Sequence, residues 1–329
     1  MRCPSNLRFF IHSMQVRNRP LLTDTFPSLD AFTPERNCAY VFGSSGEERS
    51  AHSPAWEASA IDVRFVRVTG QNDVSFDYQS SATRGTTMLR SEQQLREFWR
   101  GVDCRIVYID VTGLDHKVWA PLVKSALGMG LTVLAVYVEP GEYRFSRGPR
   151  EGDIFDLSER IAGIAPLPGF AYLGESDEAN TQFIPLLGFE GIRFKHVLEQ
   201  MQPDKTRIIP IVGVPGFRPE YPFFTYEGNR PVLDETGAWA RIRYARANCP
   251  FSLFYTLDDI AAASPGSHMK ISLIGTKPHA LGAVLYSLLS SRAVELVYDH
   301  PIRRQERTSG ASRVLVYHLS ALSLSTRPN

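Results

Sequence analysis

The sequence has few cysteines and no cysteine pattern. Four occur in 329 residues, at Cys3, Cys38, Cys104 and Cys249, without a CxxC pair or a Cys/His cluster. Zinc sites need closely spaced Cys and His ligands, so we expect no metal site. Isolated free cysteines are usually buried apolar residues. A reducing, cytoplasmic setting fits this pattern.

The chain also lacks a long apolar run and an excess of either charge. No stretch approaches the roughly 20 apolar residues of a membrane-spanning helix, so we expect no membrane partner. The 36 basic and 35 acidic side chains leave a net charge of +1. Direct nucleic-acid binding is therefore not expected, because it usually needs a concentrated basic face. A local basic pocket is still compatible with this balance.

Several catalytic and nucleotide-binding motifs are missing as well. There is no Walker A loop, no GxSxG elbow, no HExxH, and no GxGxxG after the first strand of either half. Each of these motifs carries a defined chemistry. Without them the sequence defines no catalytic constellation and no cofactor.

The first residues differ from the rest in composition. Residues 1–23 hold four arginines and no acidic side chain. A targeting segment has this composition, and so does the region before a misassigned start codon. No helical periodicity runs through the stretch, so we expect residues 1–36 to be a poorly packed lead-in.

What is present is an alternation of strands and helices. Continuous apolar runs are typical of strands covered on both faces, and one further segment alternates with period two. Strands are expected at 39–42, 61–68, 104–109, 132–138, 183–187, 207–212, 270–274, 294–298 and 313–317, and helices at 91–99, 117–128, 192–201, 236–246, 252–263 and 280–290. This order implies parallel sheets with helices on both faces. We expect an α/β protein of two Rossmann-like three-layer halves, 37–145 and 182–329, joined by a connecting segment, 146–181.

Two stretches of the chain resemble one another. Residues 107–116 and 270–279 each read as a strand ending in a polar loop and a histidine, followed by a helix and a second strand. The distance from that histidine to the proline after the second strand is 24 residues in the first stretch and 22 in the second. A tandem duplication would explain this and would let the halves share a cleft. The alternative, that any two βαβ units look alike, stays open.

Candidate site residues follow from the rule that ligands bind at the carboxyl ends of parallel strands. The most specific loop holds Gly275, Thr276, Lys277 and His279. Glycine lets the backbone approach a ligand, Thr276 can cap the next helix, and Lys277 adds a charge to a helix N-terminus that favours anions. A purely structural turn is the alternative.

The other candidates occupy matching loops. In the first half, Gly43, Ser44 and Ser45 can form a backbone nest for an anion. The next loop carries Asp110, Thr112, Gly113 and His116, and the second half adds Gly213, Arg218 and Glu220. Asp110 could bind a ribose hydroxyl or cap a helix. His116 and His279 could act in acid–base chemistry, stack on a base, or be polar surface residues.

The layout of these loops resembles CARF and SAVED domains, over about 39–140 and 183–301. The likeness rests on a polar glycine loop after the first strand of each half and on the Thr-Gly and Gly-Thr-Lys loops that include Gly113 and Gly275. It implies a Rossmann-like sensor of cyclic oligonucleotides in a bacterial defence system. Such sensors are normally fused to an effector, and no residues are left over for one here. The resemblance therefore implies a separate effector chain.

Three functions follow from this reading. The first is a regulatory protein that binds a nucleotide or another small anionic ligand. The second is an enzyme acting on a nucleotide or sugar phosphate, with Lys277, His279 and Asp110 as its reactive groups. The third is a structural subunit of a larger assembly. A homodimer is compatible with each of them.

Overall fold

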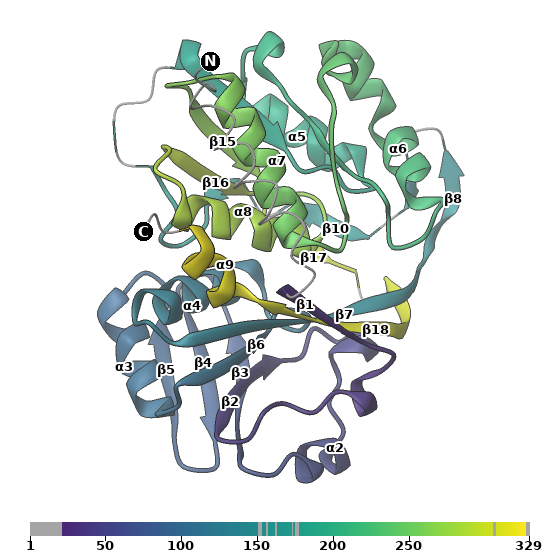
Figure 1. Ribbon diagram of the computed structural model, residues 1–329. Helices are drawn as coiled ribbons and strands as arrows, with labels where there is room; N and C mark the ends of the chain where they lie inside the picture. The colour runs from purple at the N-terminus through teal and green to yellow at the C-terminus, as the bar shows by residue number, and fades with distance from the viewer. Residues whose placement is uncertain are drawn as a thin grey trace, which may run out of the picture.

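The structure is a computed structural model. It describes residues 22–150, 153–155, 157–161, 163–172, 174, 178–304 and 307–326. Figure 1 shows two layered bodies, one above the other. We call residues 22–143 and 307–326 the first half, which is the lower body, and residues 153–304 the second half.

Four parallel strands form the centre of the first half. They lie in the order β3-β2-β6-β7 within a mixed eight-stranded sheet whose full order is β1-β18-β7-β6-β2-β3-β4-β5. The strands are β1 (Thr23–Phe26), β2 (Cys38–Gly43), β3 (Val63–Gln71), β4 (Ser75–Ser80), β5 (Arg84–Met88), β6 (Ile106–Asp110), β7 (Thr132–Tyr143) and β18 (Thr308–His318). β2 and β6 are apolar on both faces and lie in the middle of the sheet, as continuous apolar runs predict.

Parallel strands also form the centre of the second half, and antiparallel strands flank them. A four-stranded sheet, β11-β16-β15-β12, continues through parallel bridges from Phe183 to Ile208 and from Leu186 to Ile211 toward β13 and β14. The strands are β10 (Ser158–Ile161), β11 (Ala165–Pro166), β12 (Thr181–Pro185), β13 (Ile211–Gly213), β14 (Arg243–Ala245), β15 (His268–Ser272), β16 (Val294–Tyr298) and β17 (Pro301–Arg303). A hairpin of β8 (Phe145–Arg150) and β9 (Asp153–Phe155) leads in from the first half.

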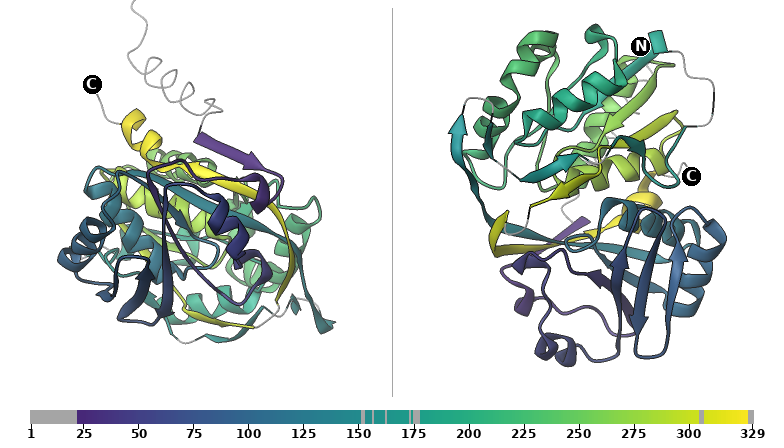
Figure 2. Two further views of the ribbon diagram at one scale, coloured as in Figure 1. Left: turned by 90° about the horizontal axis from the view of Figure 1, so that it is seen from below. Right: turned by 180° about the vertical axis from the view of Figure 1, so that it is seen from behind.

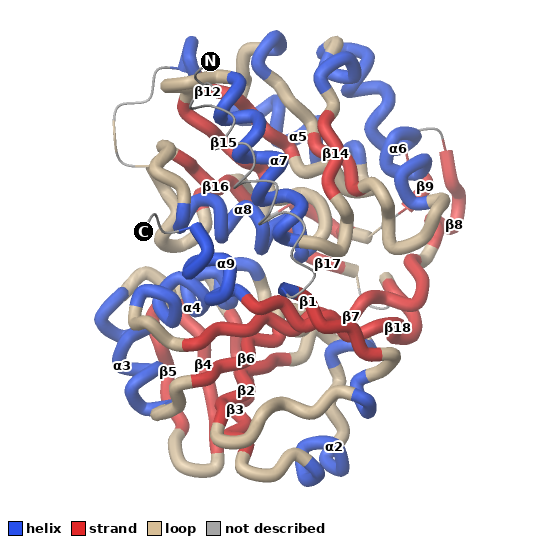
Figure 3. The backbone as a smooth tube through the Cα atoms, in the orientation of Figure 1, coloured by secondary structure: helices blue, strands red, loops and turns tan. Residues whose placement is uncertain are grey.

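Helices cover the faces of both sheets, as Figure 3 shows in blue against the red strands. The described residues contain eight: α2 (Pro54–Ser59), α3 (Glu92–Val102), α4 (His116–Gly128), α5 (Gly191–Met201), α6 (Tyr221–Thr236), α7 (Pro250–Ala263), α8 (Lys277–Leu289) and α9 (Leu319–Thr326). One continuous apolar core runs from α3 and α4 through α7 and α8. Separate cores lie under α2 on the outer face of the first sheet and under α5 and α6 on the outer face of the second. The expected α/β class is therefore confirmed, and no described helix combines the length and apolarity that a membrane crossing requires.

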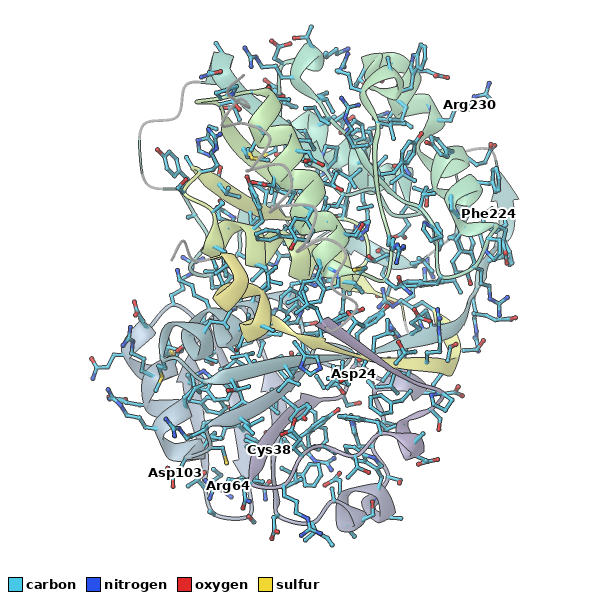
Figure 4. All side chains as sticks on the ribbon, in the orientation of Figure 1. Asp24, Cys38, Arg64, Asp103, Phe224 and Arg230 are labelled. Carbon is cyan, nitrogen blue, oxygen red and sulfur yellow. The ribbon has the colours of Figure 1, made fainter. Side chains whose placement is uncertain are left out.

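The carboxyl ends of β2, β3 and β6 point toward the second half. Figure 4 labels Cys38 at the start of β2, Arg64 near the start of β3, and Asp103 just before β6. All three lie toward the end of the first half that is remote from the second. The loops that follow these strands therefore lie between the two halves, where a ligand site of a parallel sheet is expected.

The C-terminal strand corrects the predicted domain boundaries. Residues 182–329 were expected to form one half, with an edge strand at 313–317. Instead β18 pairs with both β1 and β7 in the first sheet, and Figure 2 shows it, in yellow, running along that sheet. Val314 and Val316 face one core while Leu315 and Tyr317 face another. Because both faces are apolar, this strand is stable inside a sheet rather than at its edge.

Two other segments also depart from expectation. Residues 1–21 lie outside the described residues, but residues 22–36 of the expected lead-in contain β1 and Phe32, which is 2% exposed. In the expected connecting segment, β10 and β11 pair with β17 and β16 of the second half. Leu167 and Phe170 lie in the shared core. The described residues of this segment between Ser158 and Phe170 are therefore part of the second half and not a surface linker.

Candidate functional site

A cleft of about 780 Å³ lies between the halves at the carboxyl ends of β2, β3, β6 and β16. Its volume is within the range of small-molecule and cofactor sites. Most of the lining residues are of polar or charged types, and they come from both halves: Ser44, Ser45, Arg67, Val68, Thr69, Gly70, Gln71, Asp73, Gly113, Asp115, Lys117, Tyr298, His300, Pro301 and Ile302. We call this the interdomain cleft.

Two cations of the first half border the interdomain cleft. Lys117, in the first turn of α4, is 2.6 Å from a carboxylate oxygen of Asp73, whose side chain is 83% exposed. That hydrogen bond lowers the pKa of Asp73. The Arg67 guanidinium lies 4.9 Å from the Phe42 ring centroid and 2.7 Å from Glu57. The Arg67 side chain is 54% exposed and the Lys117 side chain 15% exposed, and both line the cleft, so a ligand anion there could share either cation with its carboxylate.

Gln71 fixes the loop that leads into α4. Its side-chain amide donates to the carbonyl of Gly113 at 3.3 Å, and its side-chain oxygen accepts from the Asp115 amide at 2.7 Å. Gly113 is required here for steric reasons, because a Cβ atom would lie 1.8 Å from the carbonyl oxygen of Gly43. This glycine therefore serves the approach of two loops to each other.

Aromatic side chains form the wall from the second half. Tyr298, at the end of β16, stacks on His116 of α4 with ring centroids 4.6 Å apart and an interplanar angle of 29°. The His300 ring is 5.0 Å from that of Tyr298. Burial, with a smaller contribution from Lys117, lowers the pKa of His300. His300 is therefore mainly neutral at pH 7 and can accept as well as donate a hydrogen bond.

The predicted backbone nest is already occupied by its own loop. The amide of Ser45 donates to the Ser50 hydroxyl at 3.1 Å, and that of Gly46 donates to the Ser44 hydroxyl at 3.3 Å. Ser44 and Ser45 line the interdomain cleft, while Gly43 is buried against Leu114. This loop therefore offers hydroxyl groups to the cleft more than a set of free amides.

Asp110 has a structural position. It is fully buried and is 3.1 Å from the imidazole of His52, and it accepts hydrogen bonds from the Tyr40 hydroxyl and the Thr112 amide. Burial alone would raise the pKa of Asp110, but the bonds from His52 and Thr112 lower it. The Thr112 hydroxyl accepts from the Val138 amide. Neither residue lines the cleft, so ribose binding by Asp110 does not fit this structure.

Lys277 is the clearest departure from the predicted site. Its ammonium group is buried and donates to three carbonyl oxygens of the first half, those of Val111 at 2.6 Å, Thr112 at 2.7 Å and Leu114 at 2.8 Å. Each ammonium hydrogen is directed to a protein acceptor, so Lys277 has none left for a phosphate. It joins the halves instead of binding the expected anion.

His279 is also internal. It is 0% exposed, and its Nε2 lies 3.0 Å from the carbonyl oxygen of Arg246. Burial lowers its pKa to about 4. The ring is therefore neutral at pH 7 and donates from Nε2. A role for this histidine in acid–base catalysis does not fit its burial.

The other predicted residues of the second half surround a different cavity. Gly213, Gly275 and Thr276 line a small space of about 90 Å³ together with Arg193 and Arg307. Both arginines are paired, with Asp299 and Glu47 respectively. Arg218 binds Glu142 at 2.9 Å, and Glu220 is exposed at the start of α6. The predicted loops therefore border two separate spaces rather than one.

Sequence reasoning missed most of the β3 end of the interdomain cleft. Arg67, Thr69, Gln71 and Asp73 fall where an alternating strand enters a polar, turn-rich stretch, which suggested only loops. The useful signal was position, because β3 is parallel to β2 and ends at the same edge. His300, directly after β16, could have been found in the same way.

Comparison with known proteins finds no matching family model. The curated proteins contain no match to this chain.

Proposed function

We propose that this protein binds a nucleotide or a similar small anionic molecule in the interdomain cleft and acts as a ligand-responsive regulator. The observation that carries the proposal is the cleft itself, which lies at the carboxyl ends of parallel strands and is bordered by Lys117 and Arg67. This is the place where open α/β sheets bind ligands. The adjacent rings of Tyr298 and His300 add an aromatic wall from the second half.

The contacts favour a regulator over the enzyme considered from sequence. Lys277, His279 and Asp110 were the proposed reactive groups, and all three are buried and hydrogen-bonded to protein atoms. The cleft is instead built from both halves, so that a ligand bound there contacts both at once. Such a ligand stabilises one relative position of the halves, which is how binding becomes a signal.

The relation between the halves supports a tandem duplication as part of the proposal. α4 and α8 pack together, and the first residue of each helix contacts the opposite half: His116 stacks on Tyr298, and Lys277 binds the loop after β6. Close glycine approaches also recur, Gly43 with Gly113 and Gly188 with Gly275. Because of the resemblance to CARF and SAVED domains, nucleotides are the first class of ligand to test. The same resemblance makes bacterial defence the first biological role to test.

The test is a calorimetric titration of the full chain with nucleoside mono- and triphosphates, cyclic nucleotides, cyclic oligonucleotides and inorganic phosphate. Loss of one charged hydrogen bond is worth about 1.5–3 kcal/mol, so Lys117→Met should weaken binding by at least tenfold. Asp73→Asn should strengthen it, because the carboxylate that competes for Lys117 is gone. Lys195→Met, at an exposed position on α5, is the control. Failure of every ligand to bind, or equal affinity in Lys117→Met, would refute the proposal.

A further inference from the structure

A second groove lies near the C-terminal ends of α4 and α8, remote from the N-termini of these two helices. It has a volume of about 500 Å³ and is lined by both halves. α3 packs on α4, and α4 packs on α8; Figure 1 shows α3 and α4 side by side with α8 above them. Its lining shares no residue with the interdomain cleft: Leu89, Arg90, Glu92, Leu95, Arg96, Pro121, Lys124, Ser125, Leu127, Gly128, Pro168, Gly169, Leu288 and Leu289. We call this the α3–α4–α8 groove.

The floor of this groove is apolar. It is made by five leucines, Leu89, Leu95, Leu127, Leu288 and Leu289, together with Pro121. The last three of these leucines are only partly buried, and Leu288 and Leu289 end α8. Covering the accessible apolar area of these leucines with a partner is favourable, because it removes that area from water.

The rim of the groove is basic. Arg90 and Lys124 are exposed, and the Arg96 side chain is 43% exposed. Glu92 is the one carboxylate of the lining, and it is paired with Arg96 at 2.6 Å. Lys124 donates to the carbonyl of Gly169, while Arg90 has no ion-pair partner in the part of the chain that the structure describes. The free carbonyl groups at the C-terminal ends of α4 and α8 add about half a negative charge each. Together with Glu92 they do not cancel the three cations Arg90, Arg96 and Lys124, so the net charge of the rim is positive.

We propose that the α3–α4–α8 groove docks an acidic amphipathic segment of a partner protein. An amphipathic helix places apolar side chains at i, i+4 and i+7 into such a groove and keeps its polar face at the rim. The leucine floor fits the apolar anchors. Carboxylates beside them would face Arg90, Arg96 and Lys124, and the charge match selects an acidic segment over a basic one.

The position of the groove connects it with the ligand site. α4 begins at the interdomain cleft, where Lys117 lies, and its last two turns form the groove. The groove also needs Leu288 and the Pro168–Gly169 turn of the second half. A change in the relative position of the halves therefore alters both sites together, and the partner and the ligand affect each other's affinity reciprocally.

The experiment is a peptide-display selection of random 16-residue segments on the full chain, without nucleotide. Enriched peptides should be acidic and carry apolar residues at helical spacing. Their affinity should fall at least tenfold on Leu288→Glu, and also on the double variant Arg90→Glu and Arg96→Glu, whose exposed side chains leave the fold intact. Arg230→Glu is the matched control, since Arg230 is 62% exposed on α6 and points away from the molecule (Figure 4).

Four results would overturn the proposal. The first is enrichment of basic or uncharged peptides. The second is enrichment of peptides that bind the charge-reversed and Leu288→Glu variants as well as they bind the native chain. The third is that the native chain enriches no more peptides than those variants do. The fourth is a monomer–dimer equilibrium that Leu288→Glu abolishes in sedimentation, which would assign the groove to a second copy of the chain. Nucleotide binding to the interdomain cleft is measured in a separate titration. Failure of the peptide experiment therefore does not refute the ligand-binding proposal.

Discussion

Replacing Lys277 by methionine should destabilise the whole fold. The ammonium group donates three hydrogen bonds, of 2.6, 2.7 and 2.8 Å, to carbonyl groups of the other half. A hydrogen bond that involves a charged group contributes about 1.5–3 kcal/mol. Losing all three would cost at most about 5–9 kcal/mol. The variant also removes the cost of burying the ammonium group, and this offsets part of the loss. Methionine keeps the apolar stem, so we expect a net loss of about 3–5 kcal/mol.

Urea unfolding followed by far-UV circular dichroism measures this loss. For a chain of this size the slope is about 3 kcal/mol per M, so the midpoint should fall by roughly 1–1.7 M. Lys195→Met is the control, because Lys195 is 56% exposed and its ion pair with Glu199 is long, at 3.9 Å. Exposed pairs of this kind contribute about 0–1 kcal/mol. A Lys277→Met midpoint that matches the control would show that the three bonds do not hold the halves together.

Three further perturbations test other parts of the structure. The pKa of His279 falls from 6.5 to about 4 on folding, so its contribution is complete above pH 6.5 and is lost as the pH falls toward 4. About 2 kcal/mol should be lost by pH 5, and His279→Gln should remove that part of the urea-midpoint pH profile; an unchanged profile would assign it to other groups. Gly113→Ala should cost more than about 3 kcal/mol, because the new Cβ would lie 1.8 Å from a carbonyl oxygen; Gly101→Ala, with open space around it in α3, should instead gain about 0.5–1 kcal/mol, and equal midpoints would contradict the clash. Burial would raise the pKa of Glu47, but its two arginine partners lower it, so Glu47→Gln should cost about 3–5 kcal/mol at pH 7, and a thermal midpoint within 2 °C of the native value would speak against a stabilising network.

The elements that sequence reasoning found are those with strong local signals. The helix expected at 117–128 is α4, and the one expected at 280–290 is α8 with an earlier start at Lys277. Helix α6 was missed, and a helix was expected at 236–246 instead. The α6 segment contains Pro222, Gly228 and Pro231, which lower helix propensity. Tertiary packing outweighs that cost. Gly228 lets α6 lie directly against the backbone at Phe189, where a Cβ atom would be 2.0 Å from the carbonyl oxygen.

The site was harder to predict than the fold for a related reason. Candidate residues were placed on the loops at strand ends, and of these Ser44, Ser45 and Gly113 line the interdomain cleft. A one-dimensional pattern cannot tell whether a lysine at the start of a helix faces a ligand or a neighbouring half. Lys277 and Lys117 both lie in the first turn of a helix, yet only Lys117 faces a cleft. That difference depends on how the halves pack.

The contact between the halves and the proposed ligand site depend on the same turn of α4. His116, the first residue of that helix, stacks on the second half, and Lys117, the next residue, borders the interdomain cleft. Lys277 holds the loop just before this turn by three carbonyl groups. Under the proposed function, a ligand bound to Lys117 would act on a segment whose position is set by both halves. Because packed interfaces have discrete arrangements and do not deform continuously, a small movement here can be transmitted along α4 as a change of state.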